Sequence, residues 1–143
     1  MPKFVERLFG MILLVAVAVP LYPLSSSADD RAFDIQGVIM KQLEAFRSRD
    51  VDAAWAIASP TIQKRFGTKN RFMEMVETFY PQIMNSRSAI FKELRDVNGN
   101  LIQRVFVEGG PGDFVDAYYT MERVDGAWRI TGVYITKPKP EGA

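Results

Sequence analysis

The chain contains neither histidine nor cysteine, and these two absences exclude more than any single residue that is present. A Ser-His-Asp triad and a Cys-His pair each need one of them, and so does a metal site with imidazole or thiolate ligands. Any catalysis would have to come from Asp, Glu, Tyr, Lys, Arg or an unaided Ser or Thr. No disulfide can support the fold, so packing alone must hold it. We expect no cofactor and no metal.

Net charge is also nearly absent, because 18 Lys and Arg oppose 17 Asp and Glu among 143 residues. Without residues 1–28 the two signs are equal in number. A neutral chain has no electrostatic reason to bind nucleic acid or an anionic membrane surface, so we expect neither as a partner. The remaining length fits a single domain.

Residues 1–28 have the three-part layout of a secretory signal peptide. Two basic residues precede an apolar run over residues 8–19, and small residues occupy positions 26–28. The run is shorter than the roughly 20 apolar residues that a membrane-spanning helix needs, and prolines interrupt its C-terminal side. We predict cleavage before Asp29 and a periplasmic or secreted protein that leaves the membrane. A retained membrane anchor is the alternative.

The first half of the mature chain has apolar residues at helical spacing. Helices are expected over residues 35–46, 51–58, 61–66 and 69–80. Asp50 is expected to cap the second helix, and Ser59 followed by Pro60 to begin the third. Gly67 is a plausible left-handed stop for it. The last helix is expected to bury Phe79 together with its apolar neighbours.

From residue 87 the period changes to that of strands. Asn98-Gly99 and Asp125-Gly126 are strong hairpin signals, because tight hairpin turns need positive φ at both central residues. Strands are expected over residues 88–97, 101–108, 114–124 and 127–136, followed by a flexible tail over 137–143. The predicted fold is a single α+β domain over residues 29–136, with N-terminal helices packed on a curved four-stranded antiparallel sheet.

Alternation along the strands predicts which side chains face the helices. The inward set comprises Leu101, Gln103, Val105, Val107, Val115, Ala117, Tyr119 and Met121. Asp116 and Tyr118 fall on the opposite face, where we expect them to meet solvent. On the last strand the apolar residues change phase, and a bulge around Thr131-Gly132 would turn all of them inward and curve the sheet.

Three sequence blocks, at residues 58–66, 72–81 and 125–133, resemble the bacterial domain-of-unknown-function family 4864. The resemblance extends from about Ile35 to Thr136. It implies the cone-shaped α+β fold of nuclear transport factor 2, the ketosteroid isomerases and cystatin-like proteins, with a curved sheet that cups helices. It implies no activity, because the family is itself uncharacterised.

The predicted cup suggests one ligand site. Gln103 is a neutral amide among apolar neighbours and must be hydrogen-bonded, either to a helix end or Tyr80, or to a ligand at the base of a pocket. Trp55, Tyr119 and Trp128 would form the walls of such a pocket, although ordinary core packing explains them as well. With Gln103 and Tyr80 they are the five residues predicted for the ligand site.

These features favour a small exported domain without catalytic activity that binds a small apolar ligand or a protein partner. The alternative is an isomerase-, dehydratase- or hydrolase-like enzyme that uses a carboxylate and a tyrosine, for which Asp116 and Tyr118 are candidates. A homodimer formed through the curved sheet is a further alternative.

Overall fold

The structure, a computed structural model, describes residues 28–141. Its elements are α1 (Ala28–Arg47), α2 (Val51–Ile57), α3 (Pro60–Phe66), α4 (Lys69–Phe79), α5 (Pro81–Met84), β1 (Ser88–Val97), β2 (Asn100–Gly110), β3 (Asp113–Val124) and β4 (Ala127–Thr136). Apart from Ala28, the predicted signal peptide lies outside the described residues. No helix within them is long and apolar enough to cross a membrane.

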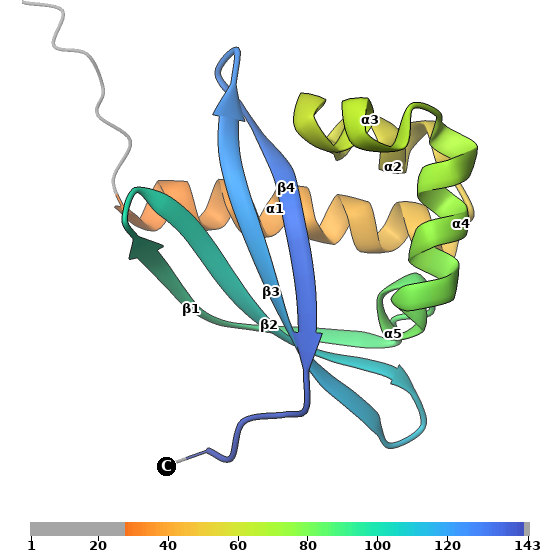
Figure 1. Cartoon of the computed structure of the whole chain (residues 1–143). Helices are drawn as coiled ribbons and strands as arrows, with labels where there is room; N and C mark the ends of the chain where they lie inside the picture. The colour runs from red at the N-terminus through yellow and green to blue at the C-terminus, as the bar shows by residue number, and fades with distance from the viewer. Residues whose placement is uncertain (1–27, 142–143) are drawn as a thin grey trace, which may run out of the picture.

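The four strands form one antiparallel sheet in the order β1-β2-β3-β4. Figure 1 shows α1 crossing behind the strongly twisted strands, while α3 and α4 lie beyond β4. The core lies between α1 and the sheet and includes side chains from both. The predicted α+β class, helices followed by a four-stranded antiparallel sheet, is confirmed.

The helix boundaries follow the predicted capping residues. The Asp50 carboxylate accepts the Ala53 N–H at 3.1 Å, and the Ser59 hydroxyl accepts the Ile62 N–H at 3.2 Å. Gly67 ends α3 with a φ of 74°. The expected burial of Phe79 is wrong, because 68% of this residue is exposed at the C-terminal end of α4. The short helix α5 was not predicted.

The two predicted hairpin turns are present. Asn98 and Asp125 have φ values of 52° and 50°, and the glycine after each also has positive φ. The predicted bulge is confirmed as well: Thr120 pairs with Gly132 and Met121 with Ile130, which leaves Thr131 as the extra residue of β4.

The predicted inner face of the sheet is confirmed, since its β2 and β3 residues are all buried. Asp116 lies on the outer face as predicted, but its expected exposure to solvent is wrong. Its carboxylate is completely buried beneath the tail, 3.2 Å from the Arg104 guanidinium, and it accepts the Lys139 N–H at 2.9 Å. Glu141 of the same tail pairs with Lys92. The mobility of the tail stays a prediction.

Candidate functional site

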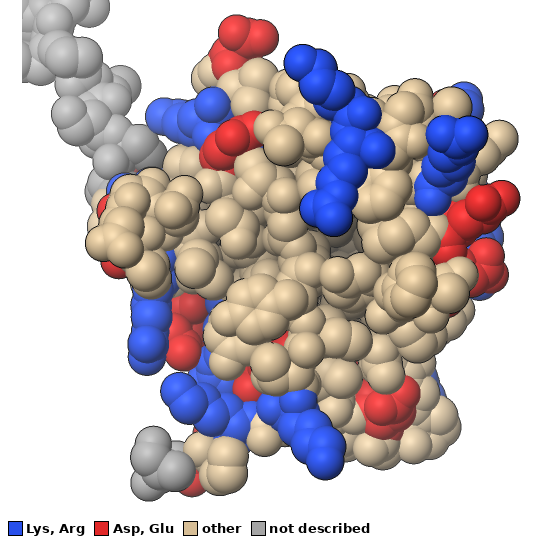
Figure 2. Space-filling view, in the orientation of Figure 1, with Lys and Arg blue, Asp and Glu red and all other residues tan. Residues whose placement is uncertain are grey.

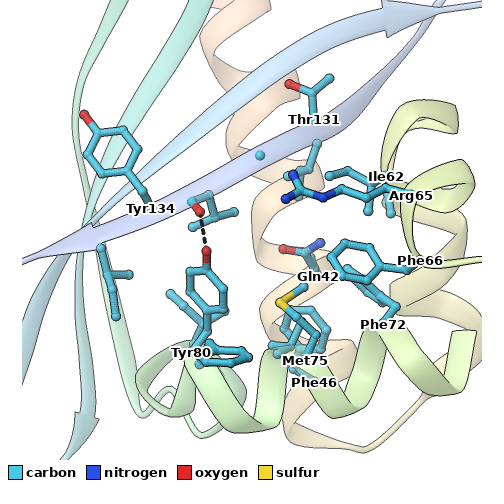
Figure 3. A pocket seen from close by; sticks show the side chains of 18 residues that line it. Gln42, Phe46, Ile62, Arg65, Phe66, Phe72, Met75, Tyr80, Thr131 and Tyr134 are labelled. Atoms are coloured by element: carbon cyan, nitrogen blue, oxygen red, sulfur yellow. Dashed lines mark hydrogen bonds between the residues drawn. The ribbon is translucent and has the colours of Figure 1, made fainter.

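A cavity of about 590 Å³ lies between the helices and β4. We call it the α3–β4 pocket. It is lined by Gln42, Phe46, Ala58, Ile62, Arg65, Phe66, Phe72, Met75, Val76, Phe79, Tyr80, Ile83 and residues 130–135. Most of these side chains are apolar, and Figure 3 shows them converging from α1, α3, α4 and β4.

Two hydrogen bonds attach the helices to β4 and thereby set the width of the pocket. The Ser59 N–H, at the start of α3, donates to the Ile130 carbonyl at 2.9 Å. The Tyr80 hydroxyl, at the end of α4, donates to the Val133 carbonyl at 2.9 Å, the dashed line in Figure 3. The pocket opens between these two attachments.

Aromatic packing forms the inner wall of the α3–β4 pocket. The Phe72 ring lies 6.1 Å from the Phe46 ring and 6.0 Å from the Phe66 ring, measured between centroids. Tilted ring pairs at this separation are favourable. They join α1, α3 and α4 into one apolar surface that faces β4.

Gln42 is the polar exception on that surface. It lies on α1 and is 2% exposed. Within residues 28–141 no hydrogen bond engages its side-chain amide, although it lines the pocket. Figure 3 shows the amide directed into the space below Arg65. The amide atoms are not fully buried, because they keep contact with the open space of the pocket, so they are available to a polar group of a ligand.

Arg65 supplies the positive charge of the α3–β4 pocket. Its side chain is exposed, and within the described part of the chain no ion pair engages it. Its guanidinium lies 5.9 Å from the Phe66 ring centroid. In Figure 3 it reaches from α3 toward β4, and Figure 2 shows Lys and Arg side chains over the gap between these two elements. No Asp or Glu among residues 28–141 lines this pocket.

Of the five residues predicted for the ligand site, only Tyr80 lines the α3–β4 pocket. Gln103 is completely buried in the sheet, and its amide nitrogen donates to the carbonyls of Lys92 at 2.9 Å, Glu93 at 3.3 Å and Arg104 at 2.9 Å. These bonds fill the bulge of β1, where the register with β2 shifts. Gln103 therefore has neither of the two expected partners, a helix end or Tyr80.

The three other predicted residues also lie apart from the pocket. Tyr119 pairs with Gln103 across β2 and β3, and complete burial raises the pKa of its hydroxyl, which has no partner in the described residues. Trp55 packs on Phe72 at 5.6 Å between ring centroids. The Trp128 indole lies beneath the Arg123 guanidinium at 5.1 Å. The structure does not bring these side chains together with Tyr80.

Gln42 and Arg65 were not predicted. Gln42 lies seven residues after Ile35 and four before Phe46, so a polar side chain interrupts the apolar stripe of α1. That interruption was a readable signal. Arg65 carried no comparable signal, because only the packing of α3 against β4 directs it to the pocket.

The residues considered for catalysis lie outside the α3–β4 pocket. Asp116 is paired with Arg104 on the outer face of the sheet, and the Tyr118 ring stacks on the Tyr134 ring at 4.7 Å. Within residues 28–141 no group of three potential metal ligands lies close together. The fold and the pocket thus define an α+β domain with an apolar pocket that contains one buried amide and one cation.

A family model described as "Domain of unknown function (DUF4864)" matches residues 28–143. The chain belongs to this family, as the resemblance predicted. No curated protein matches its sequence. Among solved structures, an NTF-2-like protein of unknown function from Burkholderia xenovorans LB400 is similar, with a TM-score of 0.46 and 15% identity over 78% of this chain and 91% of that chain.

Proposed function

We propose that this protein is an exported domain that binds a small apolar ligand in the α3–β4 pocket. The observation that carries the proposal is a pocket of about 590 Å³ with an apolar lining and one buried amide that has no partner in the described residues. Small-molecule sites have volumes of roughly 300–1,000 Å³ and combine apolar walls with a few polar groups. A binding role also fits a lining without carboxylates, which a carboxylate-dependent enzyme would need.

Export rests on the layout of residues 1–28, which nothing in the described structure addresses. The family match begins at residue 28, which supports a boundary there between leader and domain. N-terminal sequencing of the protein recovered outside the cytoplasm tests this proposal. A first residue of Asp29 supports it, and an intact Met1 in the membrane fraction contradicts it.

Ligand binding is tested by blocking the pocket. Met75 lines it from α4, whereas Met40 is a 40% exposed residue of α1 that does not. We expect the neutral fluorescent probe N-phenyl-1-naphthylamine to bind the wild-type protein and the Met40→Trp control, and to lose binding in Met75→Trp. Equal binding by both variants, or none by the wild type, would refute the proposal. Native mass spectrometry of protein from its own cells would then search for the retained ligand.

A protein partner is the second candidate, and the outer face of the sheet favours it. Ile90 is 53% exposed, Phe114 39% and Tyr134 52%, and all three lie on this face. Exposed apolar patches of this kind often mark interfaces. If the partner is a second copy, sedimentation will show a concentration-dependent dimer that Ile90→Lys abolishes. The control Phe33→Lys, at a 77% exposed residue of α1, leaves the dimer intact. A monomer at every concentration removes the homodimer.

A further inference from the structure

We propose that the ligand of the α3–β4 pocket carries a carboxylate, which binds between Arg65 and Gln42 while its hydrocarbon body lies on the aromatic wall. This inference rests on the proposed function, and it adds the chemical class of the ligand. It follows from where the two polar side chains stand on an otherwise apolar surface.

Gln42 provides the first half of the argument. Gln42 is 2% exposed as a residue, lines the pocket, and makes no side-chain hydrogen bond among residues 28–141, while its amide atoms keep contact with the open space of the pocket. Buried amides in folded proteins are normally paired, so an unpaired one that points into a cavity indicates a polar group on the occupant. The side-chain amide of Gln42 can donate a hydrogen bond or accept one, so by itself it does not determine the charge of the ligand.

Arg65 decides the sign of that charge. Its guanidinium is without an ion pair in the described residues and extends over the same space in Figure 3. No carboxylate of the lining competes for it. Arg binds carboxylates with two parallel N–H···O bonds, which are about twice as strong as neutral ones. The Gln42 amide nitrogen can donate a further hydrogen bond to the same carboxylate.

The rest of the pocket suits an apolar body. Phe46, Phe66 and Phe72 form a continuous aromatic wall, and Met75 lies beside it. The Tyr80 hydroxyl donates to the Val133 carbonyl and the Thr131 hydroxyl to the Thr120 carbonyl at 3.2 Å, while the Tyr134 ring stacks on Tyr118 at the outer face. Of the polar side chains in the described lining, Gln42 and Arg65 are those left to bind a ligand. One charged end and an apolar remainder describe an aliphatic or aromatic monocarboxylate.

The test compares two probes of equal chain length, octanoate and 1-octanol, by isothermal titration calorimetry on the protein recovered from cells. We expect the wild-type protein to bind octanoate about tenfold more tightly than octanol, the size of effect that a hydrogen-bonded charge gives. Arg65→Met removes this preference and leaves octanol affinity unchanged. Lys64→Met is the matched control, because it loses the same charge from the same helix at an exposed residue that does not line the pocket.

The outcomes separate this inference from the proposed function. If octanol binds as tightly as octanoate, or if both methionine variants reduce octanoate binding equally, the carboxylate inference is wrong and the apolar pocket stands. If the wild-type protein binds N-phenyl-1-naphthylamine but neither probe binds or displaces it, the carboxylate inference is wrong and the apolar pocket stands; if the dye does not bind either, both proposals fail. Circular dichroism confirms that each variant is folded. Should Arg65→Met unfold, Arg65→Gln removes the charge with a polar side chain and carries the same expectation.

Discussion

Replacing Gln42 by leucine should make the fold more stable, because the wild-type amide lies on an otherwise apolar surface and makes no hydrogen bond among the described residues. Leucine has similar size and extends the apolar stripe of α1. A fully buried unpaired amide costs about 1–3 kcal/mol; the Gln42 amide keeps contact with the open pocket, so its removal returns the lower part of that range, and some of the gain is lost to imperfect packing. We expect the free energy of unfolding to rise by about 1 kcal/mol, and the midpoint temperature by roughly 4 °C.

A second glutamine provides the control for this prediction. The Gln63 amide nitrogen donates to the Trp55 carbonyl at 2.9 Å and to the Ala58 carbonyl at 3.4 Å. Gln63→Leu leaves these carbonyls without their donor, so it should destabilise the protein by about 1 kcal/mol. The same chemical change thus has opposite effects at residues 42 and 63.

Urea unfolding followed by circular dichroism measures both variants, with the midpoint shift read at an unchanged slope. In the octanoate titration by calorimetry, the folded Gln42→Leu variant should bind octanoate more weakly than the wild type. If Gln42→Leu instead unfolds at a lower urea concentration than the wild type, and by as much as Gln63→Leu, the amide is satisfied in solution and the reasoning about the pocket is refuted.

Four further changes test three other polar side chains and one close contact. Tyr119→Phe removes a buried hydroxyl that lacks a partner in the described residues, so thermal stability should stay unchanged or rise. Tyr80→Phe loses the 2.9 Å hydrogen bond to the Val133 carbonyl, so the free energy of unfolding should fall by about 1 kcal/mol. Gln103→Glu places a carboxyl group among three carbonyl oxygens, which raises the pKa of that carboxyl in the folded state. The free energy of unfolding of this variant should therefore fall as the pH rises from 5 to 8. Equal urea midpoints at pH 5 and pH 8 would contradict this. Gly109→Ala would bring its Cβ to 2.4 Å from the α5 backbone, and we expect a loss of about 1–3 kcal/mol in urea unfolding.

Local signals in the sequence were sufficient to predict the longer helices, the four strands and the turns between the strands. Asp50 and Ser59 begin helices through bonds within one turn, and Asn98 and Asp125 set hairpins through their own φ values. Such features depend on neighbours in the chain, so they can be read without a structure. The bulge at Thr131 was predictable for the same reason, since the apolar period of β4 changes there.

Most residues of the α3–β4 pocket could not be predicted from local sequence signals, because the pocket depends on contacts between segments that are distant in the chain. Gln103 was correctly predicted on the inner face of the sheet. The carbonyls of Lys92 and Glu93 that it binds lie in a bulge of β1, and the sequence of β1 does not indicate this bulge. Phe79 was expected in the core, but it is the last residue of α4 and 68% of it is exposed. Arg65 becomes a pocket residue only because the Ser59 N–H binds α3 to β4.

The described residues after β4 cover the Asp116 carboxylate and therefore contribute to the stability of the sheet. The carboxylate accepts the Lys139 N–H, beyond the end of β4, so a protein shortened after Thr136 would uncover it and its Arg104 partner. Water would then reach the Asp116 carboxylate, which is completely buried in the intact domain. A fusion joined directly at Thr136 would carry the same defect on the outer sheet face, so a shortened version of this domain should retain the chain at least to Lys139.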